Sequence, residues 1–273
     1  MKSAALALVL TLFAPAVVSA AGEPLRLASH RALYDMTLQR VLPGSAVSNV
    51  QGEMVVEWLR ACDGWTFEHK SVMTVSFAAG TSAKLVTGAT SWESLDGRRY
   101  RFSLRNLTNG EESEKVVGTA ALSGPRRTGQ AEFVEPKRRT VALPAGTLFP
   151  VAHTVAVLRA ARSPSPPLLF TRMLFDGMGD DGPFSATATI GKGMRAPASP
   201  GTPAAGLAGQ RVWPVSLAYF PLASADPEPK QEIGMKLYAN GVADDLTIGF
   251  DDFTVRARLA RLEFVPPPRG CSD

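Results

Sequence analysis

The sequence is poor in the residues that usually mark a catalytic or metal centre. It has three histidines, His30, His69 and His153, and two cysteines in 273 residues. The histidines lack metal-ligand spacing, and the H-E-x-x-H, G-x-S-x-G and S-x-x-K signatures are missing. We therefore predict that the protein is not an enzyme, with no catalytic residue, metal ligand or cofactor. Only a cluster of these histidines with an aspartate in an open cleft would support the alternative hypothesis that the protein is an enzyme.

Long apolar runs are scarce as well. One apolar run, Ala4 to Ala14, follows Lys2 and precedes Val18-Ser19-Ala20, a cleavage site of the A-x-A type. This run is too short to span a bilayer, and no later run is long enough for a membrane helix. We predict a secretory signal peptide at residues 1–21 and a protein that works outside the cytoplasm, without a transmembrane segment.

Neither sign of charge dominates. The chain has 29 Lys and Arg against 25 Asp and Glu, a net charge of +4, and the bases are scattered. Arg99 and Arg101 alternate with Tyr100 and Phe102, which is typical of the solvated face of a strand. This pattern predicts no nucleic-acid partner, whereas an anionic lipid or glycan surface stays open as an alternative.

Most of the chain alternates apolar and polar residues with the period of two that is typical of β-strands. Clear examples are His30 to Arg40, Trp65 to Phe77 and Phe253 to Leu259, and Asn240-Gly241 predicts a tight hairpin. We expect about a dozen or more strands, and no break in composition demands a second domain. The fold class is therefore mostly β, one domain over residues 22–273 with a large antiparallel sheet, and an open sheet of that size must curl.

One stretch, Leu143 to Arg162, has the spacing of a helix. Pro150 suits the first helical position, and Ser163-Pro164 ends the helix because a residue before proline avoids the α region. This helix is apolar nearly all round, with Val155 among its core residues, and such helices are buried on several sides. We expect the sheet to wrap around this single central helix.

Two glycine-rich or proline-rich stretches do not carry chemistry in our interpretation. Residues Gly177 to Gly182 fit G-x-G-x-x-G, but Pro183 and a strand follow where a nucleotide site needs a helix. Asp176, Asp180 and Asp181 resemble part of a calcium loop without its full pattern. Residues 195–210 are rich in Ala, Pro and Gly, and we interpret them as a mobile loop.

The two cysteines are Cys62, at an Asp-Gly turn, and Cys271, beyond the proline run Pro266 to Pro268. An even number of cysteines in an exported chain favours a disulfide, and two free thiols are the alternative. This bond would close a loop of 271 − 62 = 209 residues.

Four sequence blocks, taken together with the two cysteines, resemble the EipB-like cell-envelope integrity family of Gram-negative alphaproteobacteria. The blocks are SHRALYD (Ser29 to Asp35), LPAGTLFPVAHT (Leu143 to Thr154), FDG (Phe175 to Gly177) and YANGV (Tyr238 to Val242). The resemblance spans almost the whole chain after the signal peptide. It implies a periplasmic β-spiral, or broken barrel, around one helix, tied by the Cys62–Cys271 disulfide and without known catalytic activity.

The leading functional hypothesis is a non-enzymatic periplasmic protein that supports cell-envelope integrity by binding envelope proteins or other envelope components. The alternative is a carrier or sensor of a lipid, an acyl chain or a lipoprotein, because a concave sheet can leave an apolar groove. Among oligomeric states we expect a monomer.

Overall fold

The computed structural model describes residues 25–179, 182–198, 201–222 and 226–271. The predicted signal peptide, residues 1–21, lies outside the described residues, as do Asp180 and Asp181. Among the described residues, no helix has the length and apolar character needed to cross a bilayer.

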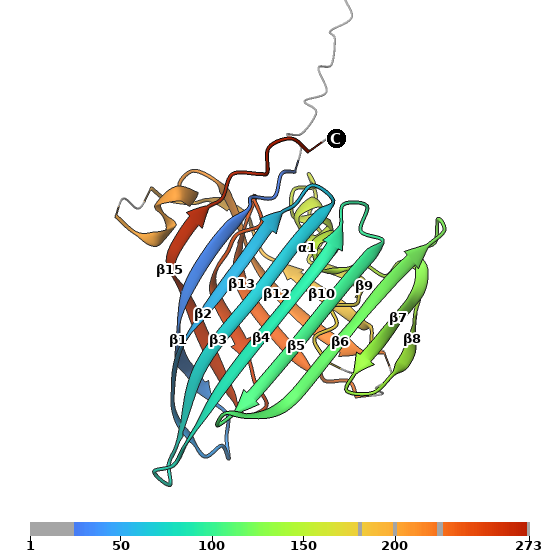
Figure 1. Cartoon of the computed structure of the whole chain (residues 1–273). Coiled ribbons are helices and arrows are strands. Elements are labelled where there is room, and N and C mark those ends of the chain that lie inside the picture. Colours follow the sequence, from blue (N-terminus) through green and yellow to red (C-terminus); the bar gives the residue numbers. More distant parts are fainter. Residues whose placement is uncertain (1–24, 180–181, 199–200, 223–225, 272–273) are drawn as a thin grey trace, which may run out of the picture.

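The described residues form strands, one α-helix and one short 3-10 helix (Figure 1). In chain order these elements are β1 (His30–Val41), β2 (Val47–Arg60), β3 (Gly64–Phe77), β4 (Ser82–Ser94), β5 (Arg99–Thr108), β6 (Glu111–Ser123), β7 (Thr128–Glu135), β8 (Arg139–Leu143), α1 (Pro150–Ala161), β9 (Leu169–Leu174), β10 (Phe184–Ile190), β11 (Met194–Arg195), η1 (Pro203–Leu207), β12 (Arg211–Pro221), β13 (Gln231–Tyr238), β14 (Ala243–Gly249) and β15 (Phe253–Phe264).

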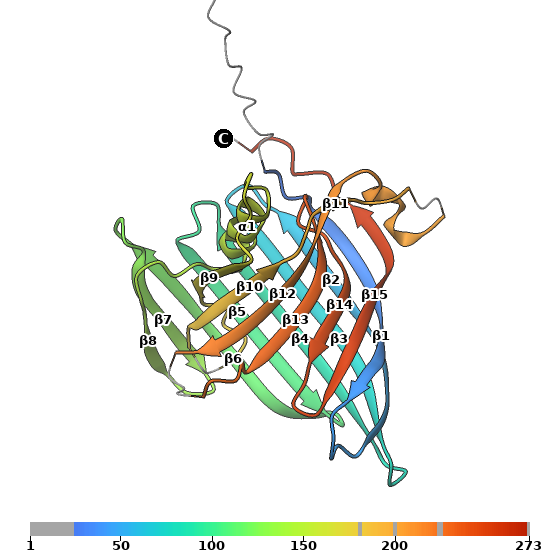
Figure 2. The same cartoon turned by 180° about the vertical axis from the view of Figure 1, so that it is seen from behind.

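All strands belong to one antiparallel sheet, in the order β8-β7-β6-β5-β4-β3-β2-β1-β15-β14-β13-β12-β10-β9, with β11 beside β12. Pairing of β1 with β15 brings the first and last strands together, so the sheet curls back on itself (Figure 2). Strands β8 and β9 remain edges, and the sheet does not close into a barrel. A parallel bridge from Leu148 to Leu174 links the two sides of this gap.

The prediction of a mostly β, curled antiparallel sheet with one helix is confirmed, and so is the alternation that suggested it. In β1, Ala32, Tyr34 and Met36 are buried, whereas Arg31 and Asp35 on the other face are exposed. The Asn240-Gly241 hairpin joins β13 to β14 as expected.

Helix α1 lies at one end of the curled sheet, together with the C-terminal tail and the β2–β3, β4–β5 and β6–β7 turns (Figures 1 and 2). We call this the helix end. The buried face of α1 carries His153, Val157, Leu158 and Ala161. Val157 and Leu158 share a core cluster with residues of β10, β12 and β13. Val155, which we expected in the core, is only half-buried because it lies beside that face.

Within the segment 195–210, the structure describes residues 195–198 and 201–210, which include short regular elements. The segment begins with the end of β11 and contains η1, and Leu207 is fully buried in the cluster that also holds Val212 and Tyr238. Leu207 therefore anchors the segment on the sheet, a role that composition alone could not show. The mobility of this segment stays a prediction.

Candidate functional site

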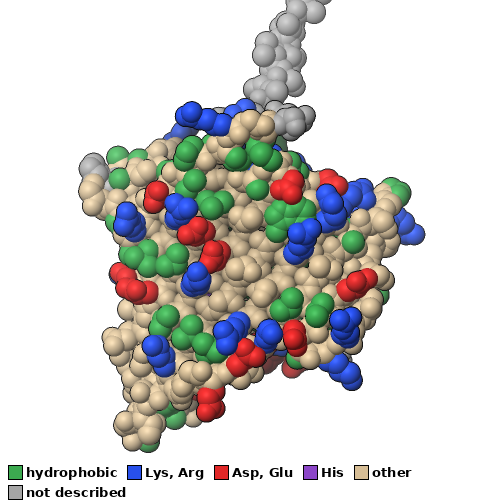
Figure 3. All heavy atoms as spheres, viewed as in Figure 1, with side chains coloured by type: hydrophobic (Ala, Val, Ile, Leu, Met, Phe, Trp, Pro, Cys, Tyr) green, Lys and Arg blue, Asp and Glu red, His purple; other side chains and the backbone are tan. Residues whose placement is uncertain are grey.

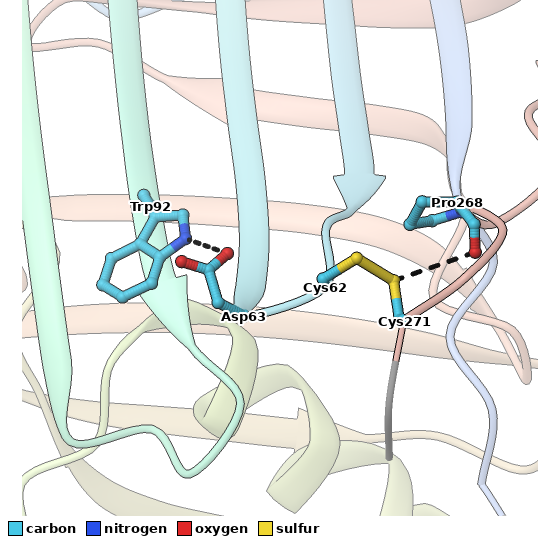
Figure 4. The surroundings of a disulfide bond; sticks show 5 residues. All are labelled: Cys62, Asp63, Trp92, Pro268 and Cys271. Carbon is cyan, nitrogen blue, oxygen red and sulfur yellow. Dashed lines mark hydrogen bonds between the residues drawn. A yellow bond between two sulfur atoms is a disulfide. The ribbon is translucent and has the colours of Figure 1, made fainter.

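The disulfide joins Cys62 in the β2–β3 turn to Cys271 in the C-terminal tail, with the two Cα atoms 5.1 Å apart (Figure 4). That separation lies within the range of ordinary disulfides. The Sγ of Cys271 also lies 3.8 Å from the carbonyl oxygen of Pro268. The pairing thus fastens the proline-rich tail to an early hairpin at the helix end.

The turn that carries Cys62 is attached to its neighbour. Asp63 accepts a hydrogen bond from Trp92 Nε1 on β4 at 3.4 Å, and its carbonyl oxygen accepts the N–H of Leu95 at 3.2 Å (Figure 4). The guanidinium groups of Arg99 and Arg101 lie 5.8 and 5.1 Å from the Trp92 ring, as cation–π contacts. The disulfide, the β2–β3 turn and the β4–β5 turn therefore form one connected surface.

A buried carboxylate fixes the start of α1 to the sheet. Glu93 on β4 is 2% exposed, and its Oε2 and Oε1 accept the N–H groups of Val151 at 2.7 Å and Ala152 at 3.0 Å. These are N–H groups that a helix leaves without an internal partner, and no side chain of the N-cap residue Phe149 supplies one. Glu93 is therefore a long-range cap of α1.

Burial shapes the charge state of this cap. Desolvation raises the pKa of Glu93 to about 7, against the opposing effects of the two N–H donors and of the Arg127 guanidinium. Arg127 in turn donates to the carbonyl oxygens of Gly97 and, at 3.4 Å, of Thr147. The β4–β5 turn, the β6–β7 turn and the segment before α1 are thus held together at the helix end.

The three histidines lie on three different elements. His30 is the first residue of β1 and its Nδ1 lies 2.8 Å from the Ala28 carbonyl oxygen, whereas His69 lies on β3 and His153 on α1. Burial lowers the pKa of His30 and of His69. Burial first, and Arg172 second, lower the pKa of His153 to about 4. The described residues contain no group of three or more His, Cys, Asp and Glu arranged to hold a metal ion.

In the part of the glycine-rich stretch that the structure describes, Gly177 has a packing role. Gly177 has φ +66°, and a Cβ at this position would lie 2.3 Å from Cγ of Phe102. The neighbouring Asp176 carbonyl oxygen accepts the hydroxyl of Tyr100 at 2.8 Å, and the Asp176 carboxylate accepts the N–H of Met178 at 3.0 Å. Gly177 therefore permits a close approach to a cluster of aromatic rings, which consists of Tyr100, Phe102, Phe133, Phe149 and Phe175.

The inner face of the sheet is not uniformly apolar. Ser71, Thr87, Asn106 and Glu114 are register partners across β3 to β6, and Asn106 Nδ2 donates to Glu114 Oε2 at 2.7 Å. Asn106 lies two residues after the buried Leu104 and so shares its face. This polar row interrupts the apolar lining that an acyl chain would prefer.

Two shallow hollows lie elsewhere, over β10 and β12 to β15. A hollow of about 280 Å³ is lined partly by Lys236, Asp245, Arg256 and Arg258. A more apolar hollow of about 340 Å³ adjoins it, over the register row Thr189, Ser216, Gly234 and Thr247. Along each strand, the residues of this row alternate with residues whose side chains pack on α1. Because neighbouring residues of a strand point to opposite faces, the second hollow lies on the face of the sheet that points away from α1.

An antiparallel sheet that curls without closing, with a helix at one end, defines a β-barrel-like protein. The sequence matches the EipB-like family over residues 21–266, and the chain belongs to this family. It is 30% identical over 260 residues to the cell envelope integrity protein EipB of Brucella abortus (strain 2308), an alignment that covers 93% of this chain and 91% of that protein. The crystal structure of a β-barrel-like protein from Brucella abortus superimposes with a TM-score of 0.80 at 29% identity, covering 89% of this chain and all of that chain.

Proposed function

We propose that the protein supports the integrity of the cell envelope as a non-catalytic binding protein of the periplasm. The observation that carries this proposal is the alignment with the cell envelope integrity protein of Brucella abortus, at 30% identity over 93% of the chain.

The test is a deletion strain challenged with detergents and with antibiotics that act on the cell wall. We expect lower survival than in the parent strain, and recovery when the gene is restored. Normal resistance in the deletion strain would contradict the proposal. Localisation is measured separately by fractionation, and protein found in the cytoplasmic fraction would contradict the periplasmic assignment.

A second candidate is a carrier or sensor of an apolar ligand such as an acyl chain. The hollow of about 340 Å³ favours it, since ligand pockets begin at about 300 Å³ and are mostly apolar.

Native mass spectrometry of protein isolated from the periplasm would reveal a bound lipid. Gly234→Leu should displace it, because a Cβ at Gly234 has only ordinary contacts and the added side chain fills the hollow. Gly88→Leu, in an open position on β4, is the matched control. Protein that is always free of ligand removes this candidate.

A further inference from the structure

Basic side chains gather at the helix end. Six of the exposed bases there lie on loops, on the tail, on α1 and on the short strand β11: Arg26, Arg126, Arg159, Lys192, Arg195 and Arg269. The acidic residues of the described turns at this end are Asp63 and Asp96, and both are engaged. Asp63 accepts Trp92 Nε1, and Asp96 accepts the hydroxyl of Ser94 and the N–H of Arg98. In Figure 3 this end, at the top of the view, shows basic side chains at its extremity, with hydrophobic side chains below them.

Exposed apolar side chains accompany these bases. Leu95 in the β4–β5 turn is 49% exposed, Leu168 before β9 is 69% exposed and Met194 in β11 is 56% exposed. Leu169 and Phe264, also exposed, begin β9 and end β15 at the same end. Leu222 and Phe250, at the opposite end, are also exposed, at 45% and 37%, so the helix end is distinguished by exposed apolar side chains that lie beside exposed bases on turns with few acids.

The opposite end has a different character. The acidic pair Glu111-Glu112 begins β6, Asp251-Asp252 lies in the β14–β15 turn, and Asp226 and Glu228 lie between β12 and β13. The exposed bases at this end include Arg40, Lys84, Lys137 and Arg138. Acids and bases are mixed at the opposite end, so an anionic surface would attract the helix end, whose turns offer few acids, more strongly than the other end, which favours one orientation for docking.

Bases interspersed with projecting apolar side chains fit the interface of an anionic bilayer. Phosphate headgroups pair with Arg and Lys, while Leu and Met reach the boundary with the acyl chains. A nucleic acid would match the charge but offers no apolar layer for Leu95, Leu168 and Met194. An acidic protein is the competing partner, and it would bind through a fixed set of contacts and not through lipid composition.

We propose that the helix end is a docking surface for an anionic phospholipid membrane, on which the protein lies peripherally with the opposite end facing away. The juxtaposition that carries this inference is the gathering of exposed bases and exposed Leu and Met side chains around α1, where the turns offer few acids. The inference deepens the proposed function by naming one envelope component, and it rests on that proposal only for the compartment.

The test is sedimentation of the purified chain without its signal peptide with vesicles of phosphatidylglycerol and phosphatidylcholine, and with phosphatidylcholine alone. We expect binding to the anionic vesicles, weakened by salt. The triple variant Arg126→Gln, Arg159→Gln, Lys192→Gln should bind at least ten-fold more weakly, since each base near an anionic leaflet contributes a factor of about five. The control Arg40→Gln, Lys84→Gln, Arg138→Gln removes the same charge from the opposite end and should change binding less than two-fold. Leu168→Ser should weaken binding at high salt, where the apolar contribution remains.

Equal losses in the two triple variants would overturn the proposal, because binding would then depend on net charge and not on the helix end. Absence of binding to anionic vesicles at low salt would overturn it as well, and capture of an acidic envelope protein would then identify the competing partner. The deletion phenotype of the proposed function is measured in cells, so the two proposals fail separately.

Discussion

Glu93 on β4 accepts the N–H of Val151 at 2.7 Å, so the first turn of the only α-helix among the described residues is capped from the sheet. The residues are 58 positions apart in sequence. The contact ties the position of α1 to the β4–β5 turn, because the carboxyl oxygens of Glu93 accept N–H groups that the first turn of a helix leaves free. The arrangement of the helix end therefore depends on one buried side chain.

Glu93→Gln should lower the stability of the protein and change its dependence on pH. Gln keeps one acceptor oxygen but turns an N–H₂ group toward the second helix N–H, so we expect a loss of about 2 kcal/mol. The pKa of Glu93 is raised to about 7, so between pH 4.5 and 7 the folded chain keeps a proton that the unfolded chain has lost. The stability contributed by this group is therefore present below pH 4.5 and declines as the pH rises to 7, by about 2–3 kcal/mol.

Urea unfolding of the parent and of Glu93→Gln from pH 4.5 to 8 measures this difference. The buried histidines act in the opposite direction, since their lowered pKa makes stability fall as the pH falls, and they cancel in the comparison. Glu111→Gln, at an exposed carboxyl of the opposite end, is the control and should give a flat difference. A flat difference for Glu93→Gln as well would contradict the buried cap.

Val157→Asp should unfold or strongly destabilise the protein. Val157 is 2% exposed and packs in the cluster shared with β10, β12 and β13, so an aspartate there would be a buried and unpaired charge. We expect a loss of about 4 kcal/mol or more, or no folded protein. Arg159→Asp, two residues along on the exposed side of α1, should change the melting temperature little. Equal behaviour of the two variants in thermal melting would show that α1 is not packed on the sheet.

The periodicity of the sequence predicted most of the sheet, because alternation of side chains follows directly from the pleat of a strand. Thus His30 to Arg40 corresponds to β1, and Pro150 begins α1 as expected. Glu93 and Arg127 could not be identified in the same way. Their roles depend on the meeting of β4, the β6–β7 turn and α1, which are far apart in the chain, and no local pattern distinguishes Glu93 from a solvated glutamate. The gathering of bases at the helix end was equally hidden, since it becomes visible only when the turns are sorted by the end of the sheet at which they lie.

Gly177→Ala should destabilise the aromatic cluster. Gly177 has φ +66° and its added Cβ would lie 2.3 Å from the Phe102 ring, which is buried. Strain and displacement of the ring should together cost about 2–4 kcal/mol, measured by urea unfolding. Gly124→Ala is the matched control, because Gly124 has φ +64° with no atom within 4 Å, and only the backbone strain of about 1–2 kcal/mol applies. A cost no larger than that of Gly124→Ala would show that Phe102 moves aside freely.

Replacing both Cys62 and Cys271 by Ser should leave the sheet folded and release the C-terminal tail. The chain-entropy estimate for a loop of 209 residues is about 5 kcal/mol, an upper value because residual structure in the unfolded chain reduces it. We expect the melting temperature to fall by about 10 °C. Limited proteolysis should cut first beyond Val265, since the N–H of Val265 still holds the start of the tail to the Ser29 carbonyl oxygen. A reducing agent should lower the melting temperature of the parent to that of the variant and leave the variant unchanged. Thiol labelling of the denatured, non-reduced parent, followed by gel electrophoresis, completes the test. Two reactive thiols in protein taken from the periplasm would refute the pairing. A covalent dimer on the gel would place the bond between two chains.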